Sequence, residues 1–398
     1  MNVRVLIVGA WFPYPPRWGW ATRVYQLARQ LALRHDVTLL TYATSADEEN
    51  VAELERQGIH VETVRQEAPS TARRRTTQLR SLLGRTPYEP HRTYSREMQE
   101  RIDRLFATEA FDVVQLESTL VWPFRFPAGT PLVLDEHNVD YETYARMREG
   151  ARSPIRKAFY LVEEGRVRRY EQDAWRRSSG LVLTSAREEE MAKEVAPGTA
   201  TAVVPNGVDT EYFTPDSGEI EPRTIVFNGV LDYRPNLDAA LFLADEVLPR
   251  VHETHPDARV VVVGRGGPDE LNQVRRPNVD ATGEVPDVRP HLARAEVVAV
   301  PILAGSGTRF KVVEGLAMAK PMVSTAVGCE GIGVEHGRHL LIADSPKDFA
   351  SAIVRLFDDA ALGASLGQAG REFVEREYSW GRAGERLQAL YDVVLESR

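Results

Sequence analysis

The chain has 398 residues, of which 43% are hydrophobic and 27% are charged, as in ordinary globular proteins. The single cysteine, Cys329, excludes an internal disulfide and any metal site built from several cysteines. Residues 1–200 carry 29 Lys/Arg against 28 Asp/Glu, and residues 201–398 carry 20 against 30. Because neither half is strongly basic, we do not expect nucleic acid as a partner.

Membrane spans and targeting segments are not expected either. No apolar run is long enough to cross a bilayer, and the run at residues 3–8 is too short and strand-like for a signal peptide. The expected location is therefore the cytoplasm.

The first half alternates short apolar runs with segments of helical periodicity. Such alternation is typical of an α/β fold, a doubly wound parallel sheet with helices on both faces. The predicted strands cover residues 3–8, 36–42, 59–64, 112–116, 131–135 and 180–184. The sequence therefore predicts a Rossmann-like domain over residues 1–203.

A stretch rich in Pro, Gly, Asn and Asp at residues 204–222 interrupts this alternation and marks a linker. The alternation then restarts, which predicts a second Rossmann-like domain over residues 223–378 and a closing helix at 379–398 that returns to the first domain. Its predicted strands cover residues 224–229, 259–263, 296–301, 322–325 and 339–343. Two such domains would face each other across a cleft at the carboxyl ends of their strands, where ligands bind in these folds.

The glycine-rich turn GSGTRFKVVE at residues 305–314 lies between a predicted strand and a predicted helix. Gly305 and Gly307 let backbone N–H groups approach a ligand closely, and Thr308 is the expected N-cap of the helix. Helix starts bind anions because their unpaired N–H groups and the helix dipole point outward together.

Three charged residues follow these glycines. Arg309 offers a planar fork for a phosphate and Lys311 a mobile point charge, so the pair suits a diphosphate. Glu314 shares a helix face with Lys311 and is suited to accept hydrogen bonds from ribose hydroxyls. The alternative interpretation is a solvated Lys–Glu pair beside a loop.

Taken in order along nearly the whole chain, a set of short motifs resembles the GT-B glycosyltransferases, and within them the large retaining group called family four. That family includes many bacterial cell-envelope and exopolysaccharide sugar transferases. The motifs are the Pro-rich loop with Gly19, DEHN at 135–138, VPNGVD at 204–209, FNG at 227–229, TGEV at 282–285, the 305–314 turn followed by MAKP at 318–321, and YSW at 378–380.

The resemblance implies roles for several residues. Glu314 matches the family glutamate that holds the ribose, and His137 a histidine that lines the donor-sugar pocket. A turn residue that bonds its own loop is the other interpretation of His137. Gly283 and Val285 match a loop that borders the nucleobase, and Gly19 a glycine that lets the first loop approach the diphosphate or the acceptor.

The chain also departs from the family pattern. Ser306 stands where the family has the first of two glutamates, and a hydroxyl is a weaker acceptor than a carboxylate, so the donor sugar is left open. The family's cations after the strand that ends at Gly229 are displaced here. We expect Arg309 and Lys311, with Gly307 and Thr308 beside them, to replace those cations and Arg234 to stand in reserve.

The reaction implied by the resemblance moves a sugar, of the hexosyl type, from a nucleotide diphosphate sugar to an acceptor hydroxyl with retention at the anomeric carbon. The acceptor would be a glycan, a lipid-linked molecule or a small molecule. The products would belong to envelope polysaccharide, glycolipid or glycoconjugate biosynthesis. No clustered Asp/His ligand set is visible in the sequence, so neither a metal nor another cofactor is expected. Two alternatives remain, a nucleotide-sugar epimerase and a non-catalytic sugar-nucleotide-binding protein.

Two arginine features complete the analysis. Arg23, one turn after Gly19, is interpreted as a solvated helix residue. An arginine-rich segment at residues 73–104 also carries leucines and resembles a basic interfacial surface, which predicts peripheral attachment to an anionic membrane and a lipid-linked or glycan acceptor. Solvated charge is the alternative there.

Overall fold

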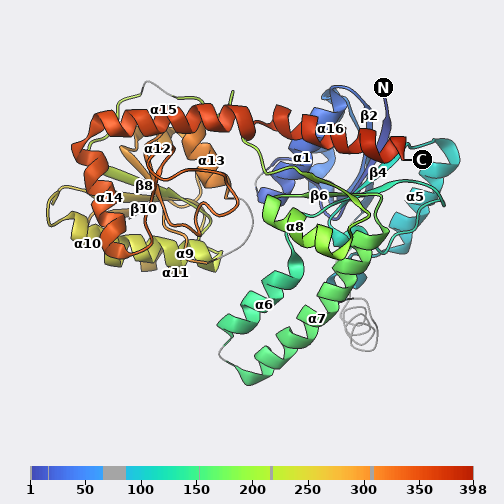
Figure 1. Cartoon of the computed structure of the whole chain (residues 1–398), viewed down its shortest axis with the longest axis horizontal. Coiled ribbons are helices and arrows are strands. Elements are labelled where there is room, and N and C mark those ends of the chain that lie inside the picture. The colour runs from blue at the N-terminus through green and yellow to red at the C-terminus, as the bar shows by residue number, and fades with distance from the viewer. Residues whose placement is uncertain are drawn as a thin grey trace. The chain divides into compact units, whose positions relative to one another are not determined.

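The computed structural model describes residues 2–16, 18–65, 87–151, 153–215, 218–304 and 309–397. It divides into two units, one formed by residues 1–205 with 383–398 and the other by residues 206–382 (Figure 1). Each unit is built around one parallel sheet. The predicted cleft between the two domains stays a prediction.

The first unit contains seven strands in the order β3-β2-β1-β4-β5-β6-β7, and every neighbouring pair is parallel. The register places Val5 beside both Val37 and Val113, so the central strand is buried on both sides. The strands are β1 (Arg4–Gly9), β2 (Asp36–Ala43), β3 (Ile59–Arg65), β4 (Val113–Glu117), β5 (Leu132–Asp135), β6 (Gly180–Leu183) and β7 (Ala200–Val203).

Several helices with an apolar stripe cover this sheet. The first of them buries Val24, Leu27 and Leu31, and Ser95 and Ser185 cap two others by accepting hydrogen bonds from backbone N–H groups. The helices are α1 (Gly19–Ala32), α2 (Glu48–Arg56), α4 (Tyr88–Thr93), α5 (Arg96–Thr108), α6 (Asp140–Gly150), α7 (Pro154–Arg177), α8 (Ala186–Val195) and the part of α16 (Trp380–Glu396) that follows residue 382, with short 3-10 turns at η1 (Ser45–Asp47) and η2 (Thr119–Val121).

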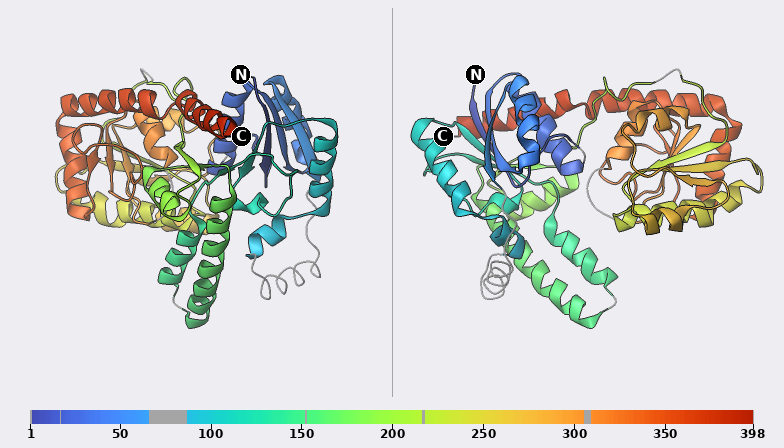
Figure 2. Two further views of the ribbon diagram at one scale, coloured as in Figure 1. Left: turned by 45° about the vertical axis from the view of Figure 1, so that its right-hand side comes forward. Right: turned by 180° about the vertical axis from the view of Figure 1, so that it is seen from behind.

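The second unit contains six parallel strands in the order β10-β9-β8-β11-β12-β13. They are β8 (Thr224–Asn228), β9 (Arg259–Val263), β10 (Val279–Ala281), β11 (Val297–Val300), β12 (Met322–Ser324) and β13 (Leu341–Ile342). The helical segments are α9 (Arg234–Leu241), the π-helical η3 (Phe242–Val247), α10 (Leu248–Val251), α11 (Pro268–Val274), α12 (Arg289–Arg294), α13 (Phe310–Ala317), α14 (Pro346–Asp358) and α15 (Ala360–Glu377). Figure 2 shows the helices on both faces of the sheet.

Each sheet has a point where the strand order reverses. In the first unit β1 lies between β2 and β4, and in the second β8 lies between β9 and β11. Helices that follow two such adjacent strands leave on opposite faces of the sheet, which opens a crevice at the carboxyl ends of the strands. The residues just after β1, β4, β8 and β11 are therefore the candidates for ligand contact.

The predicted fold class is confirmed, and the predicted strands are present within a residue or two of their expected ends. Two strands, β7 and β10, were missed. Both are short edge strands that carry Ala, Thr or Asp, and an edge position does not demand a continuous apolar run. Within the described ranges, none of the helices combines the length and the apolar composition that crossing a bilayer requires.

Candidate functional site

The helix α13 begins at Phe310, and Arg309 occupies its N-cap position. The expected N-cap at Thr308 is therefore wrong by one residue. Ser306, Gly307 and Thr308 lie outside the described residues, as does Gly305. Apart from that N-cap, what was predicted for these four residues stays a prediction.

Lys311 projects from the first turn of α13 toward the end of β8. Its ammonium donates a hydrogen bond of 2.6 Å to the amide oxygen of Asn236 in α9 and lies 4.8 Å from the ring centroid of Phe227. Asn236 in turn donates to the backbone carbonyl of Val230 at 2.8 Å, which fixes its oxygen toward the lysine. The cation is thus held in place by an amide dipole and an aromatic face.

Glu314 lies one turn further along the same face of α13. One of its carboxylate oxygens accepts a hydrogen bond of 3.1 Å from the amide nitrogen of Asn228, the last residue of β8. The amide oxygen of Asn228 is buried and has no hydrogen-bond partner among the described residues. A buried acceptor without a partner is costly, and such an atom points to a donor on a ligand or a water molecule.

Burial sets the protonation of both charged groups. It lowers the pKa of the Lys311 ammonium to about 7, and the neighbouring Arg309 guanidinium contributes to the decrease. Burial also raises the pKa of the Glu314 carboxyl to about 7, against the opposing effects of the Asn228 hydrogen bond and the Lys311 charge. Both groups therefore change charge near neutral pH, as is common in binding and catalytic sites.

Gly229 makes room for this arrangement at the end of β8. A Cβ at this position would lie 2.9 Å from the side-chain amide carbon of Asn236 and 3.1 Å from the Lys311 ammonium. Gly264 follows β9 with a φ of +147°, and a Cβ there would collide with the Gly229 carbonyl. The two glycines thus bring β8, β9 and the lysine close together.

The solvated Lys–Glu pair is wrong as an interpretation, because Lys311 and Glu314 are half-buried and each contacts an asparagine. Arg234 does not contact Lys311 or Glu314, but pairs with a neighbour on its own helix. Its guanidinium is 73% exposed and pairs with Asp238 at 2.6 Å, one turn along α9.

The two residues expected to border a nucleobase lie after β10. Gly283 has a φ of +75°, and its carbonyl accepts a hydrogen bond of 3.2 Å from the Gly264 N–H. Val285 is half-buried and packs against the core of the unit. Gly283 therefore lies on the same edge of the sheet as Gly229, since Gly264 lies against both.

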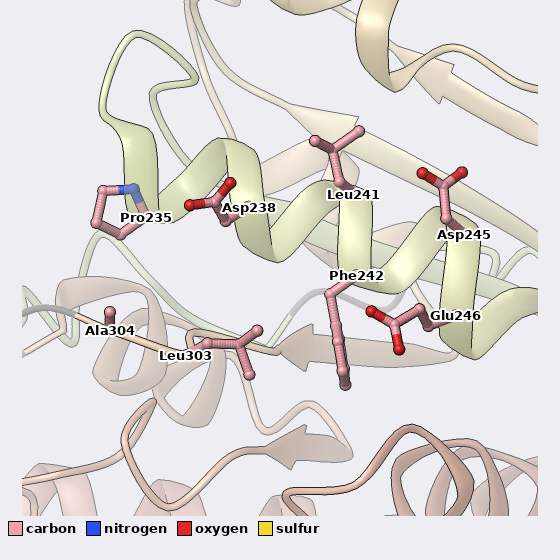
Figure 3. Close-up of a pocket in the computed structure, with 8 residues that line it drawn as sticks. All are labelled: Pro235, Asp238, Leu241, Phe242, Asp245, Glu246, Leu303 and Ala304. Atoms are coloured by element: carbon pink, nitrogen blue, oxygen red, sulfur yellow. The ribbon is translucent and has the colours of Figure 1, made fainter. Parts of the chain in front are cut away.

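A pocket of about 340 Å³ opens beside this region, between α9, η3 and the segment after β11 (Figure 3). Its lining combines apolar side chains with three carboxylates, and so does not suit a diphosphate. The lining residues are Pro235, Asp238, Leu241, Phe242, Asp245, Glu246, Leu303 and Ala304.

His137 follows β5 in the first unit. Its Nε2 atom lies 2.8 Å from a carboxylate oxygen of Glu117, the last residue of β4, and its side chain is only 9% exposed. Gln115 donates to the other Glu117 oxygen at 2.7 Å. Burial raises the pKa of Glu117, while the hydrogen bond to His137 opposes that increase. The histidine thus bonds a neighbouring strand rather than its own loop, and the turn-residue interpretation is wrong.

Arg23 was interpreted as a solvated helix residue, and this is wrong. Its side chain is buried and contacts both carboxylate oxygens of Asp135 at 2.8 to 3.1 Å, while another nitrogen donates to the Val204 carbonyl at 2.8 Å. The arginine joins α1, β5 and the residue after β7. A short-range sequence pattern cannot reveal a partner 112 residues away.

The structure also brings Asp135, Glu117 and His137 together, with one potential ligand atom from each within 4.8 Å of the others. The expectation that no Asp/His set is clustered is therefore wrong. Arg23 already contacts both oxygens of Asp135, and Gln115 and His137 contact Glu117. Of the three residues, Asp135 is thus paired with an arginine cation. The prediction that no metal is required stays a prediction.

Three tryptophans surround the first turn of α1. The Trp20 ring stacks on the His137 ring at 5.8 Å between centroids, and Trp18 stacks on Trp20 at 5.5 Å. Trp11 meets both indoles edge-on. Gly19, between the two stacked tryptophans, is exposed at the start of α1. Stacked rings therefore connect the exposed Trp18 with His137 through Trp20.

The arginine-rich segment at residues 73–104 lies only partly in the described chain. Arg92, Arg96 and Arg101 pair with glutamates at 2.8 to 3.2 Å, which favours solvated, paired charge at these three positions. The arginines between 73 and 85 lie outside the described residues.

Sequence reasoning missed the asparagines that hold the charged groups. Asn228 precedes Gly229 at the end of a predicted strand, which is the position where a side chain reaches a ligand. Asn236 gave a weaker signal, since only the fold brings α9 against α13.

Two family models match consecutive parts of the chain. The description "Glycosyltransferase Family 4" matches residues 19–212, and "Glycosyl transferases group 1" matches residues 222–359. The phosphatidyl-myo-inositol mannosyltransferase of Mycolicibacterium smegmatis is 28% identical over 210 residues, which cover 50% of this chain and 53% of that protein. The chain thus covers about half the length of this curated relative.

Solved structures share the fold. The sucrose-phosphate synthase of Thermosynechococcus elongatus matches over the whole of both chains with a TM-score of 0.75 and 18% identity. The Anabaena protein HepE, in complex with UDP-glucose, also matches over both full chains, with a TM-score of 0.68 and 14% identity. The chain belongs to the GT-B glycosyltransferases of the family-four type.

Proposed function

We propose that this protein transfers a hexosyl group from a nucleoside diphosphate sugar to an acceptor hydroxyl, with retention at the anomeric carbon, in the synthesis of an envelope polysaccharide, glycolipid or other glycoconjugate. Family membership supports the reaction class. The relative from M. smegmatis is named as a phosphatidyl-myo-inositol mannosyltransferase, and HepE was solved with UDP-glucose.

One observation carries the assignment of the donor site. A half-buried cation, Lys311, and a half-buried carboxyl, Glu314, lie one turn apart on α13 beside the carboxyl end of β8, and each is held by an asparagine. A cation suits the diphosphate and a carboxylate suits the vicinal hydroxyls of the ribose.

The proposed catalytic role of the site is to stabilise negative charge on the leaving diphosphate. When the bond between sugar and diphosphate breaks, negative charge grows on the leaving phosphate, and preorganised cations stabilise that charge. Lys311 and Arg309, at the head of α13, supply two cations and a helix start. On the family's mechanism the leaving phosphate takes the proton of the acceptor hydroxyl, so the protein needs no carboxylate nucleophile. His137 would line the donor sugar.

The test is a comparison of Lys311→Met and Glu314→Ala with Lys347→Met, which removes an exposed lysine of α14. UDP-, GDP-, ADP- and dTDP-sugars are screened first by thermal shift, since a ligand that binds the native state raises the melting temperature. With the donor that binds, the first two variants should lose about a hundredfold in transfer rate. The Lys347→Met control should behave as the wild type.

Near-normal transfer by both site variants would overturn the proposal. Conversion of the donor without any acceptor would instead indicate an epimerase, and donor binding without transfer to a broad acceptor panel would indicate a binding protein. Proton NMR of the fresh product reports the anomeric configuration and so decides between retention and inversion.

A further inference from the structure

The hairpin formed by α6 and α7 projects from the first unit. Figures 1 and 2 show both helices extending away from the sheet of that unit. The base is anchored, because the Glu171 carboxylate accepts hydrogen bonds from the Asp140 and Tyr141 N–H groups at 2.7 and 3.1 Å, and Trp175 donates to Glu136 at 2.7 Å. Nearer the tip, Arg148 pairs with Glu164 at 2.9 Å, and this ion pair connects the two helices.

The tip of the hairpin differs from its base in burial. Buried residues of α7 begin at Glu163, and none of the described side chains at residues 154–162 is buried. At a rise of about 1.5 Å per residue, these nine positions extend the helix by about 14 Å beyond its first buried residue. The tip is therefore available to another surface.

The exposed side chains of the tip are unusually apolar. Phe159 is 54% exposed, Leu161 57%, Val162 52% and Met147 48%. Phe159 and Val162 are three residues apart and share one face of α7. Isolated exposed apolar residues need no explanation, but four within sixteen positions at a projecting tip mark an interaction site.

The charge of the tip identifies the partner. The described residues of the tip, 146–151 and 153–162, carry four Lys/Arg and one Asp/Glu, in a chain whose net charge is −9. Two of these cations, Arg146 and Arg148, pair with Glu142 and Glu164. Arg156 and Lys157 are exposed, and neither forms an ion pair within the described parts of the chain. Two copies of such a tip would repel each other, whereas an anionic lipid surface would attract the cations and receive the apolar side chains.

We propose that the tip of the α6–α7 hairpin, residues 146–151 and 153–162, is a membrane anchor that inserts Phe159, Val162 and their neighbours among the headgroups of anionic lipids. The two helices carry their apolar residues into the interface, and Arg156 and Lys157 bind the headgroup phosphates. This anchor is separate from the donor site, and it does not depend on the proposed glycosyl transfer.

The experiment is co-sedimentation of the full chain with vesicles of phosphatidylglycerol and, separately, of phosphatidylcholine. The wild type should bind phosphatidylglycerol vesicles at low salt, lose most of that binding at 0.5 M NaCl, and leave phosphatidylcholine vesicles unbound. Arg156→Glu/Lys157→Glu should weaken binding by at least about fivefold for each cation removed. Phe159→Ser/Val162→Ser should also lose binding.

Matched controls remove equally exposed apolar residues elsewhere in the same unit. Leu33→Ser after α1 and Val393→Ser in α16 should bind vesicles as the wild type does. Binding of a nucleoside diphosphate should be unchanged in every tip variant, which separates this proposal from the proposed function.

Several outcomes would overturn the proposal. They are a wild type that ignores phosphatidylglycerol vesicles, tip variants that bind as well as the wild type, or equal loss in the Leu33→Ser control. A concentration-dependent dimer in light scattering that Phe159→Ser/Val162→Ser converts to a monomer, without vesicle binding by the wild type, would assign the tip to a second copy of the chain instead.

Discussion

The Lys311 ammonium is held 2.6 Å from the amide oxygen of Asn236, so a residue of α9 determines where a cation of α13 points. Because Gly229 leaves space beside both groups, the pair lies directly at the end of β8. This contact gives the lysine a fixed position and a hydrogen bond that favours its charged form.

Replacement of Asn236 by leucine should therefore weaken nucleotide binding. The pKa of Lys311 is about 7, and loss of a hydrogen bond to the charged form lowers it further, so that fewer ammonium groups are present at pH 7.5. We expect about a tenfold loss in affinity for the preferred nucleoside diphosphate, measured by calorimetry. Gln273→Leu, on the exposed face of α11, is the control. Unchanged affinity in Asn236→Leu would show that the contact does not position the cation.

Nucleotide binding should also exchange protons in two opposite directions. With a pKa of about 7, Lys311 is half-protonated at pH 7 and gains a proton when a diphosphate favours its charged form. Glu314, also with a pKa of about 7, loses a proton when ribose hydroxyls favour its carboxylate. On binding the nucleotide, the Glu314→Gln variant should thus take up more protons than the Lys311→Arg variant. The affinity of Glu314→Gln for the nucleotide should fall as the pH rises through 7, because Lys311 then loses its charge.

The measurement is calorimetry at pH 7 in two buffers with different ionisation enthalpies. The phosphate of the ligand titrates equally in both variants, so their difference reports the two side chains. Identical proton exchange in Glu314→Gln and Lys311→Arg would contradict the proposed contacts.

Glu314 should make the stability of the protein depend on pH between 4.5 and 7. Its folded pKa of about 7 exceeds the ordinary value of 4.5, so the native state binds the proton more tightly than the unfolded chain. The wild type therefore loses stability as the pH rises from 4.5 to 7, whereas Glu314→Gln does not. The melting temperature of the variant minus that of the wild type should therefore increase by about 2–4 °C when the pH is raised from 4.5 to 8. A difference that stays constant with pH would contradict this assignment.

The buried ion pair of Arg23 and Asp135 should be essential for the first unit. Arg23→Ala leaves a buried carboxylate without its counterion, which costs about 3–5 kcal/mol in the free energy of unfolding. Denaturant unfolding measures the loss. Arg177→Ala removes the exposed partner of Asp173 and should cost less than about 1 kcal/mol. Equal effects of the two substitutions would mean that burial does not strengthen the Arg23 contact.

Metal chelation should leave the transfer reaction unchanged. The cations proposed for the leaving diphosphate are Lys311 and Arg309, and the clustered carboxylates Glu117 and Asp135 already accept hydrogen bonds from protein side chains. Transfer rates in EDTA, with and without added Mg²⁺ or Mn²⁺, test this expectation. Loss of activity in EDTA that Mg²⁺ or Mn²⁺ restores would overturn it, and Glu117→Gln would then show whether the cluster holds the ion.

The sequence was sufficient for the fold because the information is local. Alternating runs of Val, Ile and Leu can be satisfied only by strands buried on both faces, and their spacing fixes the parallel crossovers. The sequence also indicated Lys311 and Glu314, since residues three apart on a helix share a face. Weakly apolar edge strands such as β7 and β10 lack this signal.

Only the tertiary structure decided which partners these residues meet. Asn236 reaches Lys311 from 75 positions away, Asn228 reaches Glu314 from 86, and Arg23 reaches Asp135 from 112. Such contacts arise when separate strands end at one edge of a sheet, and no periodicity in the sequence encodes them. Burial at that edge moves the pKa values of Lys311 and Glu314 toward 7, because protonation depends on the surroundings that the whole fold creates.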